Sequence, residues 1–228
     1  MPRAVPPRRK AAARQAVPRW KRRKEARPAE IVAAGLELFV ERGFAATRLE
    51  EVARRAGVTK GTLYLYFASK EALFKAVVRE TIVPAIARAE ALAERHTGTA
   101  RALFEELARG MWREHTESAM AGIPKLITAE AGNFPELARF YYEEVVKRGH
   151  AVFANVLRRG IANGEFRPVH VPSAVKLAIA PLLHAAALKQ SILKCVPEAF
   201  DAKQYIDTHI TIFLDGVRQA PVVDTPNA

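Results

Sequence analysis

The chain has 228 residues, of which 50% are hydrophobic, and this length allows one or two globular domains with a sizeable core. Its single cysteine, Cys195, excludes an intrachain disulfide and fits a cytoplasmic protein, with the thiol expected to fill apolar space. No uninterrupted apolar run approaches the roughly 20 residues needed to cross a bilayer, and no secretion signal follows the basic N terminus, so we expect no membrane partner.

The formal net charge of +12 is concentrated at the N terminus. Residues 1–27 contain 11 lysines and arginines and one acidic residue, Glu25, whereas the rest of the chain carries 25 basic against 23 acidic side chains. Such a segment, interrupted by four prolines, cannot bury enough surface to fold alone and predicts a disordered basic arm. Two interpretations stay open: an arm that follows DNA phosphates or enters a minor groove, and an unspecific solvated tail.

The first helix is predicted from Pro28 to Arg42. Proline is favourable in a first helical turn because it lacks only an amide that would be unpaired there. Gly43 should end the helix, since glycine adopts a left-handed backbone without steric cost. The positions expected to face inward are Ile31, Gly35, Leu38 and Phe39.

A second, shorter helix should follow. Thr47 and Glu50 have the T-x-x-E spacing of a capping box, in which the hydroxyl and the carboxylate each satisfy a free amide at the helix start. The helix is therefore expected to begin at Arg48, and Gly57 should close it. Its apolar face recurs at helical spacing and consists of Leu49, Val52, Ala53 and Ala56.

A third helix is predicted to begin at Lys60, capped by Thr59. Two short helices joined by a tight turn are typical of a helix-turn-helix, whose second helix places its first turn against the base edges of the major groove. Lys60 can donate to guanine acceptors, Gly61 lets the backbone come close, and Thr62 can hydrogen-bond or touch a thymine methyl. The alternative is a short helical hairpin in an all-α core without a DNA-binding role.

Further along, Leu63 and Phe67 should hold this helix to the core, while two tyrosines offer their hydroxyls to phosphates. Ser69 is expected to cap the next helix, and the lysine after it places a cation beside an amide-rich terminus, which suits a phosphate. The expected DNA contacts are Thr47, Arg48, Thr59, Lys60, Gly61, Thr62, Tyr64, Tyr66 and Lys70.

The run Pro28–Glu80 closely resembles the DNA-binding domain of the TetR/AcrR family of bacterial transcriptional regulators. Several of that family's hallmarks occur together, so the resemblance is more specific than a generic helix-turn-helix pattern. The matching segments are Ala34–Phe44, residues 52–58 (VARRAGV) and residues 59–73 (TKGTLYLYFASKEAL).

This resemblance implies an all-α fold of about nine helices. It places a helix-turn-helix head at residues 28–75, a helical effector-binding and dimerisation body at 76–218, and a flexible tail at 219–228. Two residues depart from the commonest pattern. Arg48 is expected to add a phosphate or base contact, and Leu65 is expected to remove one.

The body is predicted to be helical throughout. Helical periodicity continues from Lys70 to about Arg95, with Pro84 as either an internal bend or a break between two helices. The last two helices resemble the pair by which the family forms a homodimer through a four-helix bundle. A two-fold dimer would match a palindromic double-stranded DNA operator. The further helices expected are Thr99–Glu117, Pro124–Gly132, Pro135–Asn163, Pro172–Lys194 and Asp201–Val217.

Large apolar residues with a few polar tips are the candidates for a pocket that binds a small hydrophobic or aromatic effector, although each is also typical of plain core. No metal, cofactor or enzymatic activity is expected, because the sequence lacks metal-binding histidine spacings, a P-loop and a G-x-S-x-G turn. The candidate ligand contacts are Phe104, Met111, Trp112, His115, Leu126, Tyr141 and His184.

Three functions follow from these features. The first is a transcriptional repressor that a ligand releases from its palindromic operator. The second is a constitutive or architectural DNA binder that uses the basic arm without an effector. The third is an enzyme or lipid carrier that uses the helical body, and the predicted apolar pocket is the only feature that supports it.

Overall fold

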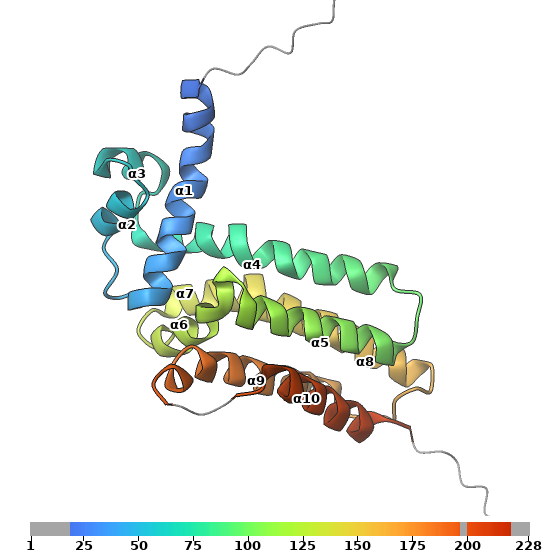
Figure 1. The fold of residues 1–228 in the computed structure, drawn as a ribbon. Helices are drawn as coiled ribbons and strands as arrows, with labels where there is room; N and C mark the ends of the chain where they lie inside the picture. The colour runs from blue at the N-terminus through green and yellow to red at the C-terminus, as the bar shows by residue number, and fades with distance from the viewer. Residues whose placement is uncertain (1–18, 197–199, 220–228) are drawn as a thin grey trace, which may run out of the picture.

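Three helices form a head at one end of the molecule: α1 (Arg19–Arg42), α2 (Leu49–Arg55) and α3 (Lys60–Tyr66) (Figure 1). The long helix α4 (Lys70–Arg95) leads from this head along the body. The computed structural model describes residues 19–196 and 200–219. Within these ranges the regular structure is helical apart from one isolated bridge between Phe166 and Arg218, so the predicted all-α fold is confirmed.

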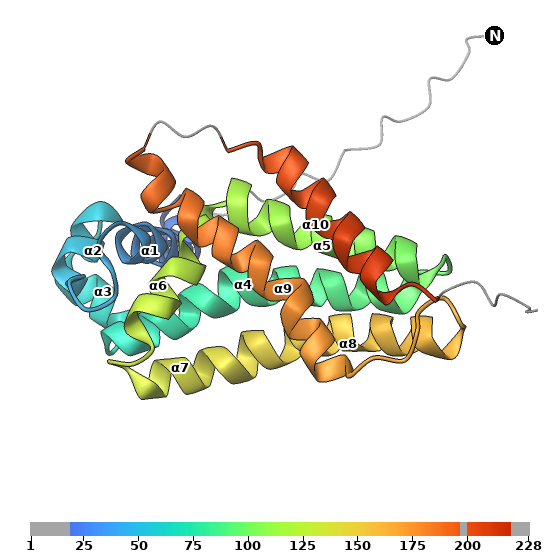
Figure 2. The ribbon, with the colours of Figure 1, turned by 90° about the horizontal axis from the view of Figure 1, so that it is seen from below.

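The body consists of long helices packed in layers. α4 and α5 (Ala100–Glu117) pack against each other and against α8 (Lys147–Ala162), while α9 (Val171–Lys189) and α10 (Ala202–Val217) form the lower layer of Figure 1 and lie nearest the viewer in Figure 2. Shorter elements complete it: η1 (Ala119–Gly122), α6 (Ile123–Glu130), α7 (Pro135–Tyr141), the π-helical η2 (Tyr142–Val146) and η3 (Ile192–Lys194).

Buried apolar side chains form two cores. The first unites the head with α4, α6 and α7, and three phenylalanines, Phe39, Phe44 and Phe74, pack against one another in it. The second lies inside the body between α5, α8, α9 and α10. Each fully buried Phe or Leu contributes roughly 1.5–3 kcal/mol. The head is therefore fixed to α6 and α7 by apolar packing as well as being joined to α4.

Most helix boundaries follow the predicted signals. The capping side chains, each of which accepts a hydrogen bond from a backbone amide three residues ahead, are Thr59, Ser69, Thr99 and Asp201. The glycines with a positive φ just past a helix are Gly43 (+86°), Gly57 (+64°) and Gly164 (+73°).

The start of α1 differs from the sequence-based expectation. The helix begins at Arg19 rather than Pro28, so the predicted disordered arm is corrected for residues 19–27. Proline in the helix removes only one backbone hydrogen bond, and the lysines and arginines before it are good helix formers. Residues 1–18 of the predicted arm and residues 220–228 of the predicted tail lie outside the described residues.

Two other helices resolve points on which the sequence was ambiguous or silent. Pro84 lies inside an unbroken α4, so the alternative of a break between two helices is wrong. The single helix predicted over residues 135–163 is divided by η2 into α7 and α8. A π turn holds more residues per turn than an α-helix, so it shifts the register of the side chains that follow.

The last third of the chain has one strongly apolar element. The segment Val171–Lys194 is long and apolar enough to cross a membrane by length and composition alone, with a mean hydropathy of 1.5 and 39% of it buried. In this fold it supplies Ile179 and Leu182 to the body core, while Leu177 on its outer face stays 67% exposed. Cys195 is exposed, so the expectation of an apolar filler is wrong.

Candidate DNA interface and effector cavity

Helix α3 is held by its apolar side and presents its polar first turn. Leu63 is fully buried and Phe67 is 8% exposed, as predicted. At the other end, Thr59 Oγ1 accepts the Thr62 amide at 3.1 Å and lies 2.8 Å from the Thr62 hydroxyl. Because Thr59 and Thr62 hydrogen-bond each other, the first turn keeps a fixed shape on the surface of the head (Figure 1).

Lys60 is exposed at the start of α3 and pairs with an acidic residue of α2. Its Nζ lies 2.5 Å from Glu50 Oε1, with side-chain exposures of 60% and 51%, and 5.8 Å from the centre of the Tyr64 ring. The hydrogen bond to Glu50 raises the pKa of Lys60, and the same bond lowers the pKa of Glu50. Because an ammonium group has three donors, a base or phosphate can bind Lys60 beside Glu50 or in its place.

The remaining expected contacts on this surface fall into two groups. Arg48, Gly61 and Tyr64 are exposed, and a methyl group placed on Gly61 would meet nothing closer than the Thr59 hydroxyl at 3.9 Å. Gly61 therefore has no internal packing reason to be glycine, which fits close approach by a duplex. Tyr66 is half-buried and packs against the head core, so the ring has a structural role whatever its hydroxyl does.

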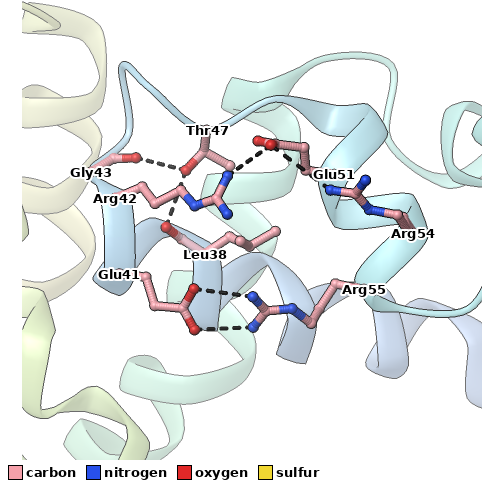
Figure 3. Close-up of polar contacts among 8 residues, drawn as sticks. All are labelled: Leu38, Glu41, Arg42, Gly43, Thr47, Glu51, Arg54 and Arg55. Atoms are coloured by element: carbon pink, nitrogen blue, oxygen red, sulfur yellow. Dashed lines mark hydrogen bonds and ion pairs between the residues drawn. The ribbon is translucent and has the colours of Figure 1, made fainter.

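Thr47 does not cap α2, which corrects one prediction. Its hydroxyl donates to the carbonyl oxygens of Gly43 at 2.7 Å and Leu38 at 3.2 Å, and the residue is only 2% exposed (Figure 3). The helix begins at Leu49 with Arg48 at the N-cap position and no side-chain cap. Thr47 therefore fastens the loop after α1 through its hydroxyl, and its contact with DNA stays a prediction.

Ion pairs orient α2 on α1. Arg55 donates two hydrogen bonds to the Glu41 carboxylate at 3.0 and 3.1 Å, and Arg42 lies 2.7 Å from Glu51 (Figure 3). All four side chains are partly or largely exposed, so these pairs fix geometry more than they add stability. They set the angle at which α2 supports α3.

Lys70 is used inside the head, which corrects a second prediction. Its ammonium donates to the carbonyl oxygens of Phe44 at 2.7 Å, Ala45 at 2.9 Å and Thr47 at 3.1 Å, and lies 4.6 Å from the centre of the Phe44 ring. An ammonium group has three donors, and each faces one carbonyl. The geometry gives Lys70 a structural role in place of the expected phosphate contact.

We therefore expect Lys70→Ala to lower the free energy of unfolding by about 2 kcal/mol, because the three loop carbonyls lose a charged donor. Urea unfolding measures this free energy. Lys75→Ala is the control, because it removes a lysine of the same helix whose ammonium lies over the Phe140 ring, 5.6 Å from its centre, instead of binding loop carbonyls. Operator affinity of the folded fraction should stay near that of the wild type. Unchanged stability together with a uniform loss of DNA binding would show that Lys70 contacts a phosphate, as the sequence predicted.

The body contains a cavity of about 1030 Å³ that is open to solvent on one side and is lined by α4, α5, η1, α6, α7, η2, α8 and α9. Four of the predicted ligand contacts line it: Met111, His115, Tyr141 and His184. The other three do not, which corrects those predictions. The Phe104 ring stacks on Phe213 with 4.7 Å between the ring centres, and Trp112 stacks on Tyr205 with 5.5 Å between the ring centres. Leu126 belongs to the core shared with the head.

Several wall residues were not anticipated from the sequence. Tyr142, Val145 and Val146 belong to η2, and His150 follows on α8. The extra residue of the π turn brings these neighbours to the cavity together with Tyr141, and regular helical periodicity gives no sign of it. Burial and, to a smaller degree, Lys176 lower the pKa of His150. Among the described residues no cluster of His, Cys, Asp and Glu suits a metal ion.

Helix α6 connects the cavity to the head. Ile127 and Thr128 line the cavity. On the same helix, Glu130 Oε1 accepts the Ala45 amide of the α1–α2 loop at 3.1 Å. Just beyond it, the ring of Phe134 meets Phe44 edge-on at 4.7 Å. A movement of α6 in the cavity wall would therefore reach the α1–α2 loop directly, and this loop precedes α2 and α3.

Known proteins match both parts of the chain. Residues 31–77 match the family model of bacterial regulatory proteins of the tetR family, and residues 94–194 match that of a tetracyclin repressor-like C-terminal domain. The HTH-type transcriptional repressor KstR2 of Mycobacterium tuberculosis is 30% identical over 150 residues, or 62% of this chain and 70% of that protein. RutR of Escherichia coli is 50% identical over 52 residues, or 23% and 24% of the two chains.

Solved structures show the same fold. KstR2 of Mycobacterium tuberculosis superposes with a TM-score of 0.62 at 24% identity, over 85% of this chain and 96% of that one. FadR of Bacillus halodurans superposes with a TM-score of 0.70 at 19% identity, over 85% and 97%. These relatives are described as transcriptional repressors or regulators, and they do not favour the architectural alternative. The chain belongs to the tetR family of bacterial regulatory proteins and is a ligand-responsive, DNA-binding transcriptional repressor.

Proposed function

We propose that the chain is a cytoplasmic homodimer that places two α3 helices in the major groove of a palindromic operator and is released when a hydrophobic or aromatic ligand occupies the body cavity. The observation that carries this proposal is the double role of α6, which is both a wall of the cavity and a support of the head. Glu130 and Phe134 transmit any displacement of α6 to the loop before α2.

Release requires the ligand to bind one arrangement of head and body more tightly than the other. A differential affinity of about tenfold, or 1.4 kcal/mol, changes operator affinity by the same factor. The cavity can supply this difference because several of its wall elements, α4, η1, α6 and α7, also pack against the head. A ligand that fits one arrangement of these walls therefore also favours one position of the head on the body.

The relatives' descriptions support a hydrophobic effector. KstR2 is described as a ketosteroid transcriptional regulator, a FadR of Bacillus subtilis was solved with stearoyl-CoA, and FrrA is described as flavonoid-responsive. Each description names a compound class with a large apolar part. The cavity of this chain, lined mainly by apolar side chains, fits the same broad class.

The outer faces of α9 and α10 support the proposed homodimer. Leu177 on α9 and Ile212 on α10 are 67% and 69% exposed, on the two helices that form the lower layer of Figure 1. We expect a homodimer by light scattering at micromolar concentration, because such apolar exposure is stabilised by pairing. Leu177→Asp should shift the mass toward the monomer, whereas Glu136→Asp, at an exposed side chain on α7, should leave it unchanged. A monomeric wild type would contradict the two-fold model.

The basic N terminus is proposed as a second, unspecific DNA contact. Residues 19–27 continue α1 beyond the rest of the head, and six of these nine residues are lysine or arginine (Figure 1). Removing residues 1–26 is expected to weaken binding to all DNA sequences alike and to lower the slope of log affinity against log salt. Filter binding at several salt concentrations measures both. An unchanged slope would make the segment an unspecific solvated tail.

Selection of bound sequences from random DNA tests the function as a whole. The wild-type dimer should enrich one palindrome with half-sites about one helical turn or a multiple apart. Adding members of a metabolite panel to the selected complex should then identify a compound that lowers operator affinity. Broad, salt-sensitive coverage without an enriched palindrome would favour the architectural binder.

A further inference from the structure

A buried hydroxyl on the cavity wall has no protein partner. Tyr141 is 8% exposed and lines the cavity, and its oxygen makes no hydrogen bond within the part of the chain that the structure describes. Across the same residues, the only sealed side-chain nitrogen or oxygen without a partner is His96 Nε2. The Tyr141 oxygen is therefore not sealed in by protein atoms, and on the wall of the cavity it is available to hydrogen-bond a bound group.

A complementary acceptor comes from helix α5, which also lines the cavity. His115 Nδ1 lies 2.8 Å from the Met111 carbonyl oxygen, and a carbonyl can only accept, so Nδ1 carries the proton. Burial lowers the pKa of His115 and keeps the ring neutral, which leaves Nε2 as an acceptor. Burial also raises the pKa of Tyr141, so its hydroxyl stays protonated as a donor.

Charged lining residues are confined to the mouth of the cavity. Arg88 and Glu114 pair at 2.7 Å with side-chain exposures of 63% and 32%, and the Glu106 side chain is 54% exposed. Arg113 and Lys125 are exposed as well. An anionic group inside the cavity would lose its hydration and face uncharged partners, whereas an uncharged oxygen would satisfy them.

We infer, on the basis of the proposed effector role of the cavity, that the effector is a bulky apolar compound whose inner end carries an uncharged oxygen, as a hydroxyl or a ketone, held by the Tyr141 hydroxyl. A hydroxyl on the ligand also donates to His115 Nε2. The apolar skeleton fills the space between α4, α8 and α9, and any charged substituent stays at the mouth beside Arg113 and Lys125.

Four pyrenes of equal ring size test this inference: 1-hydroxypyrene, 1-acetylpyrene, 1-methylpyrene and 1-pyrenecarboxylate. Their fluorescence is titrated with the full-length protein without DNA. The hydroxy and acetyl compounds should bind about tenfold tighter than the methyl compound, since a site built to hydrogen-bond an oxygen rejects the analogue that lacks it. Tyr141→Phe keeps the ring and should bring this ratio close to one. Tyr205→Phe is the matched control, because the Tyr205 hydroxyl donates to the Pro181 carbonyl away from the cavity lining, and it should leave the ratio unchanged.

Equal binding of 1-hydroxypyrene and 1-methylpyrene, tightest binding of the carboxylate, an unchanged ratio in Tyr141→Phe, or no binding of any pyrene would each overturn the inference. Its failure differs from failure of the proposed function. A Tyr141-dependent preference without operator release would sink the release model alone. Operator release by compounds that bind independently of Tyr141 would sink only this inference.

Discussion

Replacing Lys60 by alanine is expected to weaken binding to the selected operator about tenfold or more and to relax the preference at the base it faces. Lys60 is exposed at the first turn of α3, where a recognition helix meets base edges, and its pairing with Glu50 holds it ready at the surface. Repeating the selection from random DNA with the variant measures both changes.

Glu50→Gln is the matched control for this substitution. It removes the carboxylate that competes for the Lys60 ammonium, so DNA binding should become tighter and more salt-dependent. Gly61→Ala is a second control, because the added methyl meets no neighbour closer than 3.9 Å and should leave the fold intact. Its operator affinity should nevertheless fall, since the methyl stands where the duplex comes closest. Three variants that bind like the wild type would show that α3 does not read DNA.

Filling the cavity from Gly149 is expected to separate DNA binding from its release. Gly149 lies on α8 and lines the cavity, and a Cβ added there meets nothing within 4 Å. The ring of Gly149→Phe should therefore occupy ligand space and lower effector affinity about tenfold or more, while operator binding persists. Calorimetric titration with a compound that releases the wild type provides the measurement.

Gly149→Ala distinguishes occlusion from a general effect on the helix. Alanine is about 1 kcal/mol more favourable than glycine in a helix interior, so this variant should gain stability and keep its ligand. If alanine abolished binding as thoroughly as phenylalanine, the loss would come from altered helix dynamics. If phenylalanine left binding unchanged, the effector would bind elsewhere.

The head could be predicted from sequence in most of its details because its signals are local. Thr59 and Ser69 cap helices through amides three residues away, and Gly57 needs only its own backbone conformation. Periodicity also placed Leu63 in the core, since the side that a short helix buries depends on spacing alone.

Thr47 and Lys70 were misassigned because their partners come from tertiary packing. The Thr47 hydroxyl binds carbonyls at the end of α1, and the Lys70 ammonium binds a loop more than 20 residues earlier. A threonine before a helix and a lysine at a helix start look the same in sequence whether they face solvent or a loop carbonyl.

The effector site was only partly predictable for a related reason. An amphipathic pattern separates buried from exposed positions, but it does not separate a cavity wall from a filled core. From the sequence, Trp112 and Tyr141 are equally good candidates for ligand contacts. Only the packing shows that Trp112 stacks on Tyr205 and that Tyr141 lines the cavity. The π turn after Tyr141, which brings consecutive residues to the wall, leaves no periodic signature.

The distance between the two α3 helices of the dimer is the quantity on which repression and release both depend. A spin label at Leu65→Cys, 84% exposed on α3, reports it in a Cys195→Ser background that retains operator binding. On the operator, the distance distribution should be narrow and fit one helical repeat, about 35 Å, or a multiple. A saturating effector should shift or broaden it, and an identical distribution with and without effector would contradict control of α3 by the cavity.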